Sequence, residues 1–197
     1  MLQLDLLQTD LSGVKVRLEA LTQAHREPLR HLAKDERIWR FYPLQGADDA
    51  VFDAWFDESM LEMQRRVTWP YAVIDRRSEK IVGTTRYEFI VADHDRLSIG
   101  GSWLHPDAWG TGYNPDMRYL LLSHAFEALK THRVEIRVDG RNARNLSAWR
   151  SFGASEEGLL RQIFRTPEGF RADRVVFSIL TDEWPAVREK LLEKRSV

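Results

Sequence analysis

The chain has 197 residues, of which 43% are hydrophobic and 30% charged, with a formal net charge of -1 at pH 7. This is the composition of an ordinary globular protein, so disordered and fibrous classes are excluded. Arginines and acids are interleaved without a basic excess, so we expect no nucleic-acid partner.

Nothing near the first residues predicts targeting to a membrane. Asp5 and Asp10 interrupt any apolar leader, and no segment approaches the ~18 consecutive apolar residues of a membrane helix. We therefore expect a cytoplasmic protein with no membrane partner. The absence of cysteine excludes disulfides, thiolate metal sites and a cysteine nucleophile. The six histidines lack metal-ligand spacing, so we expect no metal.

The first half of the chain predicts a strand over residues 14–18 and two helices. Thr22 is the expected N-cap of a helix that runs to about Lys34, and a second helix is expected over residues 47–66. Apolar residues repeat along the second helix at helical spacing. They are Val51, Phe52, Trp55, Phe56, Met60 and Met63. Core packing is the favoured interpretation, and the alternative is that Trp55, Phe56 and Trp69 line a substrate cleft.

Three strands follow, over residues 69–74, 81–91 and 97–104, the first two joined by a polar turn. The third contains Gly100 and Gly101 in its interior. Paired glycines inside a strand indicate a bulge or a close approach of another backbone or of a ligand.

The segment after this strand has the pattern of an anion-binding loop. Gly110 and Gly112 let a ligand approach the main chain, Asn114 suits a helix N-cap, and Pro115 suits the first helical position. Free N–H groups and the positive end of the helix dipole would then face a phosphate. The alternative is a tight strand-to-helix connection. The segment lacks the Gly-Lys-Ser/Thr of a nucleotide triphosphate loop and the third glycine of a dinucleotide fingerprint.

The second half alternates strands and helices. Its expected elements are a helix with Met117, Leu120, Leu121, Phe126 and Leu129 buried, a strand over 133–138, a helix over 142–152, strands over 158–165 and 170–180, and a C-terminal helix over about 183–195. This order predicts an α/β (α+β) fold in one domain, residues 1–197. A mixed sheet of six to seven strands is expected, with helices on both faces.

The chain resembles the GNAT-type N-acetyltransferases, and most closely the RimJ/RimL branch, which acetylates protein N-termini. The resemblance rests on an ordered set of segments along nearly the whole chain: residues 16–21, 99–106, 124–127, 139–142 and 182–184. It implies acetyl-CoA as acyl donor and an amine as acceptor. The family loop Gln/Arg-x-x-Gly-x-Gly/Ala, which binds the diphosphate, corresponds here to residues 109–114, with Trp109 and Asn114 departing from it.

The resemblance also implies the site residues. Asn142 matches an asparagine that bonds the pantetheine arm in relatives, and Asn145 stands where some relatives have a serine proposed as the acid. An amide cannot give up a proton at neutral pH, so that role is lost at Asn145. Ser98 replaces an acidic residue often found before the bulge. The expected cofactor-binding residues are Trp103, Leu104, His105, Trp109, Gly110, Thr111, Gly112, Tyr113, Asn114 and Asn142.

Without cysteine, the expected mechanism is direct attack of a bound amine on the thioester in a ternary complex. Backbone N–H groups near residues 101–104 are expected to hold the developing oxyanion. Glu88 is the candidate base, with His94, Asp95 and His105 as competitors and a solvated strand face as the alternative for Glu88. The candidate catalytic positions are therefore Glu88 and Asn145.

Two functions remain open on the sequence. The first is an N-acetyltransferase acting on a peptide N-terminus or a small-molecule amine, and the second is a catalytically weak CoA-binding sensor or interaction module. Acidic residues near the second helix, such as Asp53 and Asp57, either attract a cationic acceptor or form a solvated helix face. The C-terminal helix either caps the sheet or pairs two copies in a homodimer.

Overall fold

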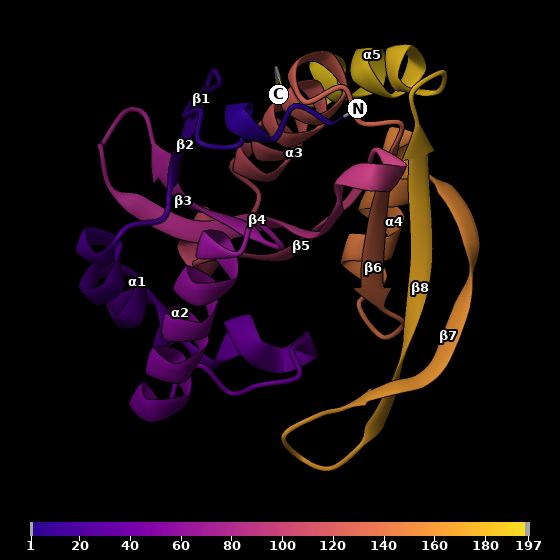
Figure 1. The fold of residues 1–197 in the computed structure, drawn as a ribbon. Helices are drawn as coiled ribbons and strands as arrows, with labels where there is room; N and C mark the ends of the chain where they lie inside the picture. The colour runs from indigo at the N-terminus through magenta and orange to yellow at the C-terminus, as the bar shows by residue number, and fades with distance from the viewer. Residues whose placement is uncertain (1, 196–197) are drawn as a thin grey trace.

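The computed structural model describes residues 2–195. These residues form one sheet of eight strands in the order β1-β2-β3-β4-β5-β6-β8-β7. Figure 1 shows how the labelled strands and helices are arranged. The strands are β1 (Leu11–Ser12), β2 (Val16–Ala20), β3 (Trp69–Asp75), β4 (Ile81–Val91), β5 (Arg96–Leu104), β6 (Arg133–Asp139), β7 (Ser155–Arg165) and β8 (Arg171–Leu180). Neighbours pair antiparallel except β5 and β6, which are parallel. The mixed sheet is confirmed, but the expected six to seven strands are eight, because two-residue β1 is too short to show a period.

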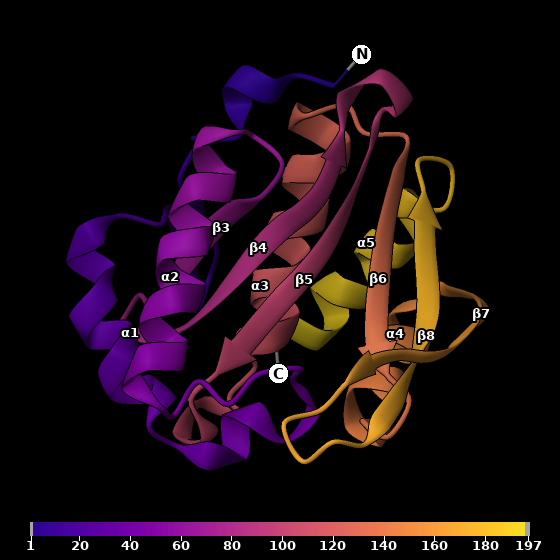
Figure 2. The same cartoon turned by 60° about the horizontal axis from the view of Figure 1, so that its bottom comes forward.

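Helices cover both faces of the sheet, as expected. They are α1 (Arg26–Ala33), α2 (Asp49–Gln64), α3 (Tyr113–Ser123), α4 (Ala143–Phe152) and α5 (Trp184–Arg195), and His124–Ala128 extends α3 as a π-helix. Figure 2 shows α3, α4 and α5 behind the strands, with α1 and α2 beside β3 and β4. The expected helix from Thr22 is divided, because Thr22 caps a short 3-10 helix, Gln23–His25, before α1 begins.

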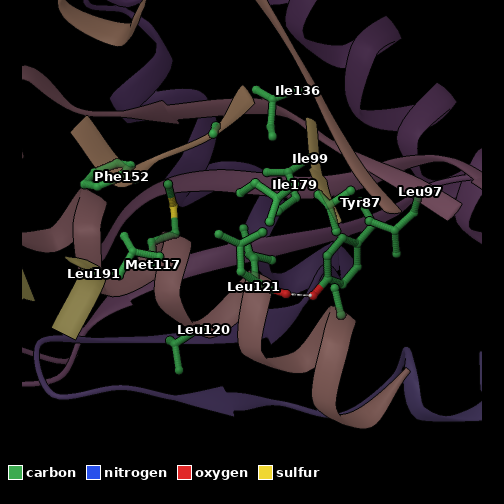
Figure 3. Packing of buried hydrophobic residues seen from close by; sticks show 14 of the residues in the cluster. Tyr87, Leu97, Ile99, Met117, Leu120, Leu121, Ile136, Phe152, Ile179 and Leu191 are labelled. Carbon is green, nitrogen blue, oxygen red and sulfur yellow. Dashed lines mark hydrogen bonds between the residues drawn. The ribbon is translucent and has the colours of Figure 1, made fainter. Parts of the chain in front are cut away.

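Because helices cover both faces of the sheet, the protein has two apolar cores. The larger lies between the sheet and α3, α4 and α5, and the smaller lies under α1 and α2. Figure 3 shows how Tyr87 of β4 is used in the larger core: its ring is fully buried and its hydroxyl donates to the Leu121 carbonyl at 2.6 Å. A buried phenol needs such a partner, so this bond fixes α3 against the middle of the sheet.

The parallel strands β5 and β6 separate halfway along their length. Their pairing runs from Arg96 to Ile99 on β5 and ends there, although β5 continues to Leu104. Figure 2 shows the two strands diverging toward their carboxyl ends. On the other side of β5, its register with β4 shifts at Gly101, which has a φ of +54°. The bulge expected from the paired glycines is therefore confirmed.

A buried carboxylate joins the start of α3 to the first hairpin and to the C-terminal helix. Asp116, in the first turn of α3, is fully buried. Its Oδ2 accepts from the backbone N–H groups of Lys15 at 2.7 Å and Val16 at 3.0 Å. Its Oδ1 lies 2.8 Å from the guanidinium of Arg195 at the end of α5. Asp116 thus holds three distant segments of the chain together.

Replacement of this carboxylate is expected to destabilise the fold. Asp116→Ala leaves two backbone donors and the Arg195 guanidinium without their acceptor, so the free energy of unfolding should fall by about 3 kcal/mol. Asp116→Asn keeps one acceptor oxygen and should lose less. Urea unfolding of both variants measures this, with Asp93→Ala, an exposed acid in the β4–β5 turn, as the control. Equal midpoints for Asp116→Ala and the wild type would contradict the assignment.

Candidate active site

The loop between β5 and α3 has the backbone conformation that its glycines predict. Gly110 and Gly112 have φ values of +80° and +82°, in the left-handed region that favours glycine. The N-cap of α3 is Gly112, so the prediction of Asn114 as N-cap was wrong. Because the left-handed Gly112 starts the helix two residues early, Pro115 is its third residue. An N–H is still unneeded there, since the first turn has no intrahelical acceptor.

Unpaired donors remain in this loop. Among residues 2–195, the backbone N–H groups of Gly110, Thr111, Gly112 and Asn114 have no hydrogen-bond acceptor. They lie at the N-terminal end of α3, where the helix dipole favours negative charge. This arrangement is suited to an anion, and we call residues 109–114 the phosphate loop.

Lys15 adds a positive charge to the phosphate loop and was missed by the sequence analysis. Its Nζ donates to the Thr111 carbonyl at 3.1 Å and occupies the place where a side chain on Gly112 would begin. Lys15 precedes β2, almost a hundred residues earlier in the chain, and no local pattern predicts its position. It reaches the loop because Asp116 binds its backbone N–H.

Trp109, where the family loop has Gln or Arg, braces the phosphate loop. Its indole N–H donates to the Leu104 carbonyl at 2.9 Å, and the Arg144 guanidinium lies 5.4 Å from its ring centroid. The Thr111 hydroxyl donates to the Ala108 carbonyl at 2.8 Å. These bonds fix the loop internally and leave its amides free.

The side chains of the remaining predicted residues of this loop and strand are buried or engaged elsewhere. Trp103 is buried in the smaller core and Leu104 in the larger one. The His105 imidazole accepts from the Asp107 N–H at 3.4 Å. Burial and a hydrogen bond with Asp75 raise the pKa of the Tyr113 phenol, so that side chain is engaged away from the loop amides.

Glu88 lies over the glycine pair of β5. Its side chain is 15% exposed and accepts from Arg86 Nε at 3.0 Å. A side chain on Gly100 would collide with the Glu88 carboxylate, and one on Gly101 would begin 2.5 Å from Arg86 Nε. The two glycines therefore make room for an ion pair that sits on the bulge. A carboxylate is thus placed where β5 leaves β6.

The competing bases lie elsewhere. His94 and Asp95 are in the turn between β4 and β5, at the opposite end of β5 from the bulge. His105 follows the end of β5, and its ring lies 3.4 Å from Asp107 and 3.9 Å from Asp35. Of the four candidates, Glu88 is the one beside the bulge.

Asn142 and Asn145 form the start of α4. The Asn142 side-chain oxygen accepts from the Asn145 N–H at 3.1 Å and caps the helix. The Asn145 side-chain oxygen accepts from Arg118 of α3, which is 6% exposed and lies 4.0 Å from the Trp149 ring. Burial lowers the pKa of this guanidinium. Asn145 thus accepts a hydrogen bond from a buried cation. The sequence analysis missed this role because Arg118 and Asn145 are far apart in the chain.

A cavity of about 580 Å³ lies beside Arg86. Its lining includes Leu44, Val51, Trp55, Glu62 and Arg86, so the interpretation of Trp55 as a cleft residue fits its position. Phe56, by contrast, is fully buried in the smaller core.

Asp53 and Asp57 of α2 contact α1 and are not among the residues that line this cavity. Asp53 lies 3.2 Å from the Arg26 guanidinium and also pairs with Arg30, and Asp57 pairs with Arg26. Their charges are neutralised by α1, which argues against these two acids as a site for a cationic acceptor.

The comparisons agree with this geometry. Residues 15–155 match the acetyltransferase (GNAT) domain. The uncharacterized N-acetyltransferase YoaA of Bacillus subtilis is 24% identical over 179 residues, covering 89% of this chain and 96% of that protein. A structure from Chromobacterium violaceum, described as a probable acetyltransferase of the GNAT family, is 31% identical. It covers 90% of this chain and 89% of that one, with a TM-score of 0.81.

Mycobacterium smegmatis RimJ in complex with CoA-disulfide has the same fold at 17% identity. The match covers 94% of each chain, with a TM-score of 0.82.

Fold, loop and comparisons together define the class: an α+β acyltransferase fold with its phosphate loop at the start of α3. The chain belongs to the GNAT family and is an N-acetyltransferase. Within residues 2–195, none of the helices has the length and apolar character needed to cross a bilayer.

Substitution of Gly100 tests the packing of Glu88. Gly100→Ala places a methyl group against the Glu88 carboxylate and should displace it, so the acetylation rate should fall at least ~10-fold with acetyl-CoA affinity unchanged. Steady-state kinetics and calorimetry measure the two effects. Gly158→Ala is the matched control, because a side chain there meets open space. A wild-type rate in Gly100→Ala would show that the position of Glu88 is unimportant.

Proposed function

We propose that this N-acetyltransferase binds acetyl-CoA at the phosphate loop and transfers the acetyl group directly to a primary amine, of a peptide N-terminus as in the RimJ/RimL branch or of a small molecule. The observation that carries the proposal is the set of free loop amides beside Lys15, at one end of a strand whose bulge carries Glu88.

The residues present fit the diphosphate of acetyl-CoA. Open backbone donors, a helix N-terminus and one ammonium group are a suitable set for a diphosphate. Gly112 has no side chain between the loop and Lys15, so both are available to the same anion. The separation of β5 from β6 beyond Ile99 supplies a route for an extended arm past the bulge. Bound acetyl-CoA supplies the acetyl thioester.

The protein's own groups then perform two tasks. Glu88 takes a proton from the acceptor ammonium, directly or through a water molecule, and leaves a neutral amine beside the bulge. Backbone N–H groups of β5 beyond Ile99, which β6 does not pair, stabilise the negative charge that develops on the carbonyl oxygen. Because the chain has no cysteine to carry the acetyl group, the amine attacks the thioester itself. Positioning of the two substrates supplies much of the rate.

The second candidate function is a CoA-binding module with weak chemistry. The engagement of Asn145 with Arg118 favours it, because no acid stands at that position. The departing thiol, whose ordinary pKa is about 8.5, gains little from an acid at neutral pH, so we favour the enzyme. Thiol release from acetyl-CoA in the presence of a panel of amines distinguishes the two.

Binding is tested with donors that do and do not contain the diphosphate. Lys15→Met should weaken acetyl-CoA binding in calorimetry about 10-fold, because one charge-assisted contact is lost. It should leave KM for acetyl-pantetheine, which lacks the diphosphate, unchanged. Lys130→Met is the control, since Lys130 is exposed beyond the other end of the α3 helix. Absence of heat with the wild type would refute the proposed function, whereas equal loss for both donors would exclude the diphosphate as the partner of Lys15.

The base is tested by Glu88→Gln, which keeps the size of the side chain and removes its proton acceptance. We expect kcat to fall ~100-fold or more and the dependence of rate on pH to change at the acidic side. The control is Glu156→Gln, which weakens another carboxylate-to-arginine pair, Glu156 with Arg150 at 2.7 Å, on the surface. An unaltered pH profile in Glu88→Gln removes Glu88 from the mechanism.

A further inference from the structure

Within residues 2–195, the Arg174 guanidinium, on the face of the sheet that carries Glu88, has no carboxylate partner. Val175, Phe177 and Ile179 of β8 belong to the core under α3, α4 and α5. Side chains alternate along a strand, so Arg174 lies on the opposite face. Its register partner, Asp139 of β6, is on that same face.

Three other arginines on or beside this face are each bound to an acid. Arg86 pairs with Glu88 at 3.0 Å, Arg137 with Glu135 at 2.7 Å, and Arg141 with Asp139 at 2.7 Å. The two acids that act electrostatically on Arg174, Glu88 and Asp139, are both committed to these pairs. Among residues 2–195, the Arg174 guanidinium has neither a hydrogen bond nor a salt bridge, so no bound carboxylate compensates its positive charge.

The surroundings of Arg174 prepare it to bind an anion. The Phe164 ring lies 4.6 Å from its guanidinium carbon, which holds one face of the group. The side chain is only partly exposed, and burial is the main influence that lowers its pKa. Burial of an unpaired charge costs free energy that a bound counter-ion recovers. The planar donor pattern of a guanidinium matches a carboxylate in particular.

Tyr42 is bonded beside the bulge and lies within electrostatic range of Arg174. Its hydroxyl donates to the Ser102 carbonyl at 2.5 Å, next to Gly101, and Tyr42 and Glu88 both act on the charge of Arg174. Arg174 is therefore on the same face of the sheet as the candidate base Glu88, near the bulge.

We propose that the acceptor is a primary amine that also carries a carboxylate, with the carboxylate bound by Arg174 and the amine delivered to Glu88. This inference rests on the proposed function and specifies its acceptor class. It differs from the cationic acceptor that Asp53 and Asp57 of α2 suggest, and those two acids are already paired with α1.

The experiment compares three acceptors of similar size: leucine, leucinamide and the α-amide of aspartate. The first has an α-carboxylate, the second has none, and the third has one on its side chain. For the wild type we expect kcat/KM to be at least 10-fold higher for one of the carboxylates than for leucinamide. Arg174→Gln should remove this preference and leave kcat/KM for leucinamide unchanged. Arg171→Gln, an exposed arginine on the same strand, should keep the preference.

The outcomes separate the two proposals. No binding of acetyl-CoA by the wild type overturns the proposed function. Binding of acetyl-CoA with no preference for a carboxylate, or with no transfer to either carboxylated amine, overturns the role of Arg174 alone, and the guanidinium then braces the β7–β8 hairpin through Phe164. Calorimetry with acetyl-CoA on each variant confirms that a loss of preference is not a loss of folding.

Discussion

The hydrogen bonds and the ion pair of the buried Asp116 carboxylate are the interactions on which the site depends most. They join the backbone before β2, the first turn of α3 and the last residues of α5, three segments that are distant in sequence. A buried carboxylate is stable when donors surround it, and here two backbone amides and a guanidinium do so. One consequence reaches the surface: the backbone bond at Lys15 directs its ammonium group to the phosphate loop. Core packing and the position of the Lys15 ammonium group are thereby connected.

A second constraint acts at the middle of the sheet. Gly100 and Gly101 of β5 have no side chains, and the space that side chains would fill there is occupied by Glu88 and Arg86 of β4. These two residues form an ion pair in that space. The same bulge ends the regular pairing of β5 with its neighbours. One local irregularity thus both ends the pairing of backbone groups and makes room for a carboxylate.

Charge pairing then distinguishes the two sides of the acceptor region. Asp53 and Asp57 of α2 are matched by arginines of α1, whereas Arg174 on the strand face has no carboxylate partner among the described residues. A surface count of charges would have suggested attraction for a cation. The pairing of these acids with arginines argues against a cationic acceptor, because a carboxylate that is already paired attracts a further cation only weakly.

The sequence by itself determined the elements and the loop. Strand and helix periods, the glycines at 100, 101, 110 and 112, and the turn residues are local signals, so the mixed sheet, the bulge and the phosphate loop follow from neighbours in the chain. Even there, the helix start was displaced by two residues, since the left-handed backbone of Gly112 rather than the capping preference of Asn114 sets it. Only the tertiary structure decided the positions of Lys15, Arg118 and Arg174. Their partners come from other elements, and a charged side chain shows its partner only when folding has removed water and brought the two together.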